Sequence, residues 1–286
     1  MPSLPPDLAS ALADGLTAGT LIPYLGPALM TLSSGPSAPP ADALALVAEL
    51  TAKTSVPGKI RHRLTQAAQF IENFKHRRTL VNAMDAAFAR TAAPSALHRW
   101  IAALRAPLVV HAWYDDVMRR AIFESSDDVS EIQALAQSEH FGTWTRAYGR
   151  EGQPLDAPSA RIGQPGHTLL YRPIGGHAPA SNYLVSDSDF VEVLTEIDIQ
   201  TPIPAAVQEL RASRGFVFIG CRFDDQLTRS FARQIMKRSA GPHFALMPQE
   251  PTRMEARFLA EQRIGRLALP LANTVEALAA TGAIAP

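Results

Sequence analysis

The feature that most constrains this chain is a series of short apolar runs separated by stretches with helical spacing. The runs are rich in branched aliphatic and aromatic residues, as buried strands are, and lie at 21–25, 106–112, 167–171, 183–185, 215–219, 244–247 and 266–269. Helical patterns lie between most of them, at 187–196, 203–213, 224–238, 253–262 and 273–281, and one precedes them at 7–18. Strands that alternate with helices predict an α/β fold, a doubly wound, mainly parallel Rossmann-like sheet of about six strands.

The stretch between the first two runs lacks a strand pattern. A proline-rich loop at 33–40 is followed by four helical patterns, at 41–53, 60–74, 76–90 and 94–104. We therefore expect an all-helical insertion at about 31–104 between the first two strands. Residues 124–166 are rich in Gly, Pro, Ser and Asp, and we expect an irregular cover there with one helix near Val129 to Gln137. The whole of 1–286 is expected to form one domain.

Composition excludes several functions. Lys and Arg together number 27, as do Asp and Glu, so there is no global field to attract nucleic acid or an anionic membrane. The one cysteine, Cys221, rules out an internal disulfide and a multi-thiolate zinc site, and the scattered histidines give no metal motif. We find no signal-peptide pattern and no run near the roughly 18 apolar residues of a membrane span. A cytoplasmic protein without metal, nucleic-acid or membrane binding is expected.

In doubly wound sheets, ligands bind outside the carboxyl ends of the strands. Four strand ends therefore deserve inspection: 26–28, 111–116, 171–176 and 220–225. The first contains Gly26 but lacks the glycine spacing of a dinucleotide fingerprint. In the last, Asp224 follows Gly220 and Cys221, and it could either face a ligand or cap the next helix. We interpret Cys221 as a small wall residue, because no histidine partner can be named for it.

Taken in order, these segments resemble a family. The opening LIPYLGPAL is similar to a first glycine turn of Gly-Ala-Gly type, VVHAWYDD to a T-T-N-Y-D-D segment, HTLLYRPIGG to a strand leading to K-L-H-G, and GFVFIGCRFDDQL to a bacterial "fiGysfsDpnl" segment. All four of the patterns that these segments resemble are those of the bacterial sirtuin-like domain family. The resemblance covers nearly the whole chain. It implies a Rossmann-like domain that binds NAD, with a small helical insert, as in bacterial relatives that often cleave NAD.

The resemblance also implies which positions form the pocket. Residues that match the family are Gly26, Tyr114, Asp115, Gly175 and Gly220. Three positions depart from it: Ala28 replaces the second glycine, Trp113 the catalytic asparagine and Ile174 the catalytic histidine. If the alignment at Ile174 shifts by a residue or two, His177 becomes the base instead. The four-cysteine zinc module of sirtuin deacylases is absent, which argues against protein deacylation.

Three functions remain open. The favoured one is a module that binds NAD, ADP-ribose or another adenine nucleotide with little or no turnover, as a sensor or a regulator of a protein partner. In it Trp113 stacks on the ligand, unless it is a core aromatic, and Arg172 pairs with phosphate. The second is an NAD glycohydrolase with a rearranged site, for which His111 and Asp115 are the candidates; His111 and Trp113 would share one face of a strand. The third is an assembly protein with a filled pocket. A protein partner and a homo-oligomer both remain open.

Overall fold

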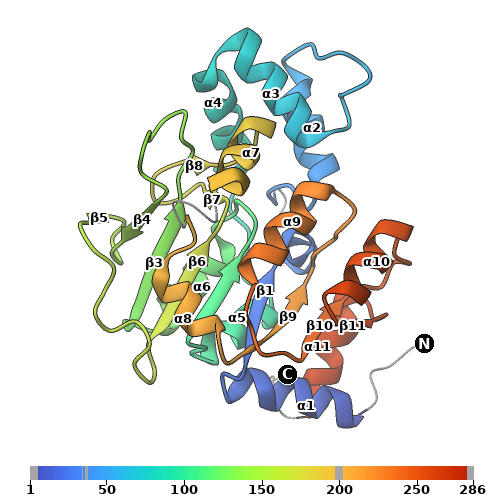
Figure 1. Ribbon diagram of the computed structural model, residues 1–286. Helices are drawn as coiled ribbons and strands as arrows, with labels where there is room; N and C mark the ends of the chain where they lie inside the picture. Colours follow the sequence, from blue (N-terminus) through green and yellow to red (C-terminus); the bar gives the residue numbers. More distant parts are fainter. Residues whose placement is uncertain (1–5, 34, 36–37, 197–201, 282–286) are drawn as a thin grey trace.

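The computed structural model describes residues 6–33, 35, 38–196 and 202–281. Nine strands form one sheet in the order β11-β10-β9-β1-β2-β6-β3-β4-β5 (Figure 1). Neighbours from β11 to β3 are parallel, whereas β4 and β5 are antiparallel. Their bounds are β1 (Leu21–Leu25), β2 (Leu108–His111), β3 (Val129–Ala134), β4 (Thr145–Tyr148), β5 (Pro154–Leu155), β6 (Thr168–Arg172), β9 (Gly215–Ile219), β10 (His243–Leu246) and β11 (Ile264–Leu267). The predicted fold class, a mainly parallel α/β sheet, is confirmed.

Two apolar clusters pack on opposite faces of the sheet, because side chains alternate along each strand. Val110 and Phe218 belong to one cluster, and Val109 and Ile219 to the other. The first cluster takes in residues of α7 (Asp187–Glu196), α8 (Ala205–Arg211), α9 (Gln226–Ile235) and α10 (Arg253–Glu261). The second takes in residues of α1 (Pro6–Thr17), α5 (Ala96–Ala103), α6 (Val117–Ser125) and α11 (Leu271–Ala280). A sheet covered on both faces explains why the strands are continuous apolar runs.

The predicted helical insertion is confirmed. Between β1 and β2 the chain forms a short 3₁₀ helix, η1 (Pro27–Leu32), and then α2 (Ala43–Ala52), α3 (Leu64–Lys75), α4 (Arg77–Phe88) and α5. Helices α2 to α4 pack on one another and stand beside α7 at the top of Figure 1, whereas α5 lies against the sheet beside α6. Ser34, Pro36 and Ser37 of the predicted 33–40 loop lie outside the described residues.

The expectation for 124–166 is wrong in part. Residues 129–134 form strand β3 rather than a helix, and β4 and β5 extend the sheet, so it has nine strands instead of about six. The reason is visible in the side chains: Glu131 and Gln133 are buried on β3 and hydrogen-bonded within the protein. Polar residues inside a central strand hide the apolar pattern that identifies a strand.

A second correction concerns residues 183–185. Here β8 (Asn182–Tyr183) pairs with β7 (Gly175–Gly176) in a separate two-stranded ladder and does not join the main sheet. This small hairpin follows β6 directly and lies at the carboxyl edge of the sheet. Nothing in the described part of the chain forms a helix long and apolar enough to cross a bilayer.

Candidate functional site

After its carboxyl end, β1 runs into a tight turn that packs against the segment following β9. Strands β1 and β9 are parallel neighbours, so Gly26 and Gly220 follow them side by side. The Gly26 N–H donates to the carbonyl of Ile219 at 2.8 Å, and the Ala28 N–H donates to that of Gly220 at 3.0 Å. A Cβ atom at Gly26 would lie 2.6 Å from the Gly220 oxygen, so the two backbones touch. Here glycine is required by chain packing.

This turn has few donors left for a phosphate group. Pro27 has no N–H, the Leu29 N–H donates to the Gly26 carbonyl at 3.2 Å, and the N–H groups of Gly26 and Ala28 are used as described. A phosphate cradle needs several free backbone N–H groups that converge on one anion. The four residues from Gly26 to Leu29 therefore do not fit the pyrophosphate of a dinucleotide.

Cys221 and Asp224 follow Gly220. Cys221 is buried, its Sγ is 3.6 Å from the Tyr24 carbonyl oxygen, and burial raises the pKa of the thiol well above its ordinary value. A protonated, enclosed thiol agrees with the wall role expected for it. Asp224 is exposed, and the cap of helix α9 is its neighbour Asp225, whose Oδ1 accepts from the N–H of Leu227 at 2.7 Å. Asp224 therefore does not have the capping role considered for it.

Trp113 and Ile174, two of the three positions expected to depart from the family pattern, are core residues. Trp113 is 5% exposed, and its Nε1–H donates to the Pro40 carbonyl at 2.8 Å. Its ring packs against those of Phe88 and Tyr114, with centroids 5.9 and 5.1 Å away. Ile174 is 7% exposed and belongs to the same apolar cluster. Of the two interpretations of Trp113, the structure has the core aromatic.

Tyr114 is also held inside the protein. Its hydroxyl donates to the Leu184 carbonyl at 2.6 Å, and burial raises the pKa of that hydroxyl above its ordinary value. Its ring packs edge-on against Tyr183 of β8, 5.9 Å between centroids. Tyr114 thereby fastens the end of β2 to the β7–β8 hairpin.

His111 and Asp115, the two catalytic candidates, form a buried pair. The Nε2 of His111 is 3.3 Å from Oδ2 of Asp115, and each residue is 1% exposed. Burial acts to raise the pKa of Asp115, but His111, the Val117 N–H and Arg172 outweigh it and hold that pKa below its ordinary value. Because β2 ends at His111, the strand alternation does not extend to Trp113, which packs in the opposite cluster from Val109. In this arrangement the pair braces the start of α6, where Asp115 accepts the Val117 N–H at 2.9 Å.

Arg172 is fully buried and occupied by the protein. Its Nη2 donates to the carbonyls of Tyr114 and Asp115 at 3.0 and 2.6 Å, and its Nη1 donates to Ala178 O at 2.8 Å and Asp116 Oδ1 at 3.1 Å. At Gly176 a Cβ atom would lie 1.8 Å from Nη2, so glycine leaves the room for this guanidinium. Arg172 holds the loop after β2 against the loop after β6 and has no Nη donor aimed at a phosphate.

At Gly175 the backbone itself requires glycine. Its φ is 74°, in the left-handed region, and a Cβ atom there would lie 2.2 Å from the Asn182 carbonyl oxygen. The residue begins β7, so it sets the close approach of β7 and β8. The glycine at this position is thus required by the hairpin.

The same edge also carries a histidine–carboxylate pair, His177 with Asp116, which is not among the main catalytic candidates from the sequence. The Nδ1 of His177 is 2.8 Å from Oδ2 of Asp116, whose Oδ1 accepts from the Ala178 N–H at 3.0 Å. The His177 side chain is 28% exposed, so its ring is open to solvent. The hydrogen bond to Asp116 raises the pKa of His177 above its ordinary value. The sequence signal is that Asp116 and His177 each follow a predicted strand; the pairing of β2 with β6 that brings them together is seen only in the structure.

Opposing effects act on Asp116. Burial works to raise its pKa, but the bonds to His177 and the Ala178 N–H and the charge of Arg172 prevail and lower that pKa to about 2. Asp116 is therefore ionised at neutral pH and orients the imidazole. Such a carboxylate-held histidine is the usual form of a general base.

The edge brings the predicted residues together in the strand order β9, β1, β2, β6, starting at Gly220 and Gly26 and ending at Gly175. The Ala112 N–H donates to Leu25 O at 2.8 Å, and the His177 N–H donates to Tyr114 O at 2.9 Å, so adjacent segments are directly linked. That these residues line one ligand cleft stays a prediction. Among the described residues, no group of three His, Cys, Asp or Glu side chains is arranged as metal ligands would be.

A mainly parallel sheet with glycine turns along its carboxyl edge defines the class, a Rossmann-like α/β protein. The model of the SIR2-like domain matches residues 107–266, more than half of the chain, so the protein belongs to the SIR2-like domain family. Membership implies an NAD-related ligand. The match begins just before β2, so it includes Trp113, Ile174 and Gly220 but not Gly26 or Ala28. A search of curated proteins finds no match.

Proposed function

We propose that this SIR2-like protein binds NAD or an ADP-ribose-type nucleotide weakly, turns NAD over far more slowly than an active relative, and serves as a sensor or partner-regulating module. The observation that carries the proposal is the state of Trp113 and Ile174. Both replace catalytic residues of the family, and both are buried core side chains.

The chemistry of the two replacements supports low turnover. An asparagine amide both donates and accepts hydrogen bonds, whereas an indole can only donate, and the donor of Trp113 is already bound to Pro40. Ile174 has no titratable group, and a positioned general base is typically worth about 10² to 10⁴ in rate. The two losses need not multiply, since groups that act together are not additive.

Weak binding follows from the β1–β9 turn. Its backbone N–H groups are used inside the protein, and Ala28 adds a methyl group where the family has a bare backbone. The turn therefore offers little to a pyrophosphate, and binding would depend on the sugar and base. We derive no catalytic step through the nucleotide from this geometry.

Calorimetric titration of the purified protein with NAD and with ADP-ribose tests the proposal. We expect saturable binding of at least one of them, in the high micromolar to millimolar range that corresponds to about −4 to −6 kcal/mol. Inorganic pyrophosphate serves as the control and should not bind, because the turn lacks free donors. Submicromolar NAD binding would contradict the weak-site account, and no saturable binding of either nucleotide would contradict the ligand class.

The His177–Asp116 pair favours a second function, an NAD-consuming hydrolase with a rearranged site. His177 has the carboxylate partner and the solvent access that a general base needs, although it lies three residues beyond Ile174. The test is nicotinamide release by the wild type, by His177→Ala and by His62→Ala, an exposed histidine that serves as the control. Turnover that is lost only in His177→Ala would support the hydrolase over the binding module.

A further inference from the structure

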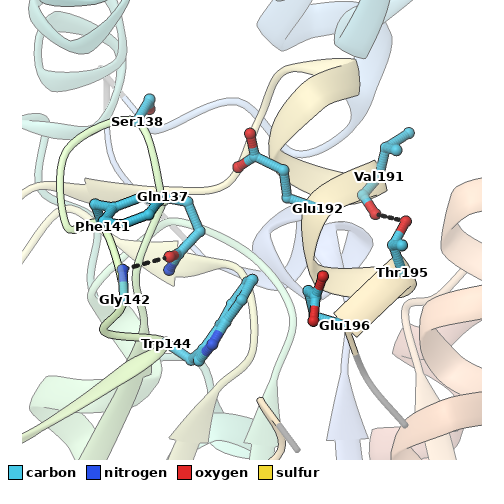
Figure 2. A pocket seen from close by; sticks show the side chains of 9 residues that line it. All are labelled: Gln137, Ser138, Phe141, Gly142, Trp144, Val191, Glu192, Thr195 and Glu196. Carbon is cyan, nitrogen blue, oxygen red and sulfur yellow. Dashed lines mark hydrogen bonds between the residues drawn. The ribbon is translucent and has the colours of Figure 1, made fainter. Parts of the chain in front are cut away.

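A cavity of about 570 Å³ lies between the segment joining β3 to β4 and helix α7 (Figure 2). Gln137, Phe141 and Trp144 line it from the β3–β4 segment, and Val191, Glu192 and Glu196 line it from α7. Its volume is within the range of small-molecule pockets. Figure 2 shows the aromatic side chains on one wall and the carboxylates on the other.

The first wall is shaped by Gln137. Its Nε2 donates to the Thr143 carbonyl at 2.9 Å, and its Oε1 accepts from the Gly142 N–H at 2.9 Å. Both ends of the amide are therefore bonded to the loop that carries Phe141. This closure presents Phe141 outward, 95% exposed, beside the partly buried Trp144.

Arg77, the first residue of α4, ties the two walls together. Its Nε donates to Glu139 Oε2 at 3.0 Å, in the β3–β4 segment, and its Nη1 donates to Asp189 Oδ2 at 2.8 Å, in α7. A partly buried cation bonded to both segments holds them together. The cavity is thus preformed, which reduces the entropy lost when a ligand binds.

The lining is acidic and aromatic. Among the described lining residues there are two carboxylates, Glu192 and Glu196, and no Lys, Arg or His. Partial burial raises the pKa of Glu192, and the nearby charges of Asp189 and Glu72 raise it further. The site therefore suits a cation with a face that can stack on an aromatic ring.

We propose that this cavity binds an arginine side chain presented by a partner protein. A guanidinium is a planar cation that stacks on aromatic faces and pairs with carboxylates, so Trp144 and Phe141 supply the rings and Glu192 and Glu196 the charge. Exposed Phe141 and Val191 at the mouth supply the apolar contact that a protein partner needs. The inference gives the partner-regulating role a surface, and it does not depend on nucleotide binding.

The test is an NMR titration of the full chain with the capped tripeptide acetyl-Gly-Arg-Gly-amide. The reporter is the indole N–H signal of Trp144, which is assigned by its loss in Trp144→Phe. We expect saturable shifts with a millimolar Kd, and about a fivefold weaker Kd in Glu192→Gln with Glu196→Gln, as expected for partly exposed ion pairs. Glu151→Gln, an exposed carboxylate outside the cavity, should leave the Kd unchanged.

The same titration includes two matched tripeptides with Gln or Lys in place of Arg. The Gln peptide should not bind, and the Lys peptide should bind more weakly than the Arg peptide. Absence of saturable shifts with the Arg peptide, an unchanged Kd in the double Glu variant, or equal binding of the Lys peptide would overturn the proposal. Because no nucleotide is present, failure here leaves the nucleotide proposal standing, and the reverse also holds.

Discussion

The two halves of the strand-end edge are built differently. At β9 and β1 the chain closes on itself through backbone contacts, with Gly26 and Gly220 packed together and the nearby N–H groups already bonded. At β2 and β6 the loops are joined by side chains: buried Arg172 holds Asp116, and Asp116 holds the partly exposed His177. In the first half the backbone N–H groups of Gly26, Ala28 and Leu29 are bonded within the protein, whereas the second half has a partly exposed group that can exchange a proton.

This difference teaches that a glycine at a strand end can be required by chain packing alone. Gly26 and Gly175 are both expected in a ligand pocket from the sequence, and each lies where a Cβ atom would strike a neighbouring backbone carbonyl. The titratable group of the second half is His177, which Asp116 holds at the edge of the sheet. Measurements that treat the two halves separately can therefore test the account.

The largest effect is expected from Arg172→Met. Removing this cation takes away one partner of Asp116 and of the buried Glu131, whose Oε1 is 3.7 Å from Nη1. The carbonyls of Tyr114, Asp115 and Ala178 also lose their guanidinium donor. Breaking one partner of a buried ionic network costs about 3 to 5 kcal/mol of unfolding free energy. Urea denaturation measures it, with Arg150→Met as the exposed control, for which less than about 1 kcal/mol is expected. A loss below about 1 kcal/mol at Arg172 would mean that side chains do not hold this half together.

A smaller loss is expected in the backbone-held half from Gly220→Ala. The glycine has φ of 71°, and a Cβ atom would lie 2.6 Å from the Leu29 nitrogen, so the turn must shift. We expect a loss of about 2 to 3 kcal/mol in unfolding free energy. Gly58→Ala is the matched control, because a Cβ atom there meets nothing within 4 Å, and its effect should stay within about 0.5 kcal/mol. Equal stability of the two variants would refute close packing at this turn.

The smallest effect is the titration of His177. Its hydrogen bond to Asp116 raises its pKa above the ordinary value, about 6.5. The pair's contribution to stability is therefore complete below that ordinary value and is lost as pH rises through the pKa of the folded state. NMR titration of the imidazole should give a pKa above about 6.5 in the wild type and a lower one in Asp116→Asn. Asp127→Asn, at an exposed aspartate, should leave the His177 pKa unaltered, and a wild-type value below the ordinary one would rule out an orienting carboxylate.

The sequence predicts best where one physical effect dominates. Strands β1 and β9 are found at their predicted bounds, because both faces of each are covered and their residues are continuously apolar. The sequence pattern fails to identify strand β3, where Glu131 and Gln133 are buried and hydrogen-bonded to side chains from distant segments. Local periodicity carries no information about such partners.

The candidate site follows the same rule. Glycines at strand ends could be located from the pattern of strands, and the resemblance located Trp113 and Ile174. The role of Arg172 could not be foreseen, because its acceptors are carbonyls of Tyr114, Asp115 and Ala178, whose positions depend on two folded loops. The His177–Asp116 pair likewise requires β2 and β6 to be neighbours, which topology alone establishes.

The most direct test of the central claim is nicotinamide release from NAD by the wild type, measured beside an active SIR2-like hydrolase. Trp113→Asn with Ile174→His, and Ile174→His alone, are assayed in parallel, with thermal melting to check that each variant is folded. The account predicts that the wild type is at least about 10²-fold slower than the active relative, because the family's amide and imidazole are missing. A folded variant carrying Ile174→His should gain rate. Wild-type turnover comparable to that of the active relative would contradict the claim that the replaced positions silence this site.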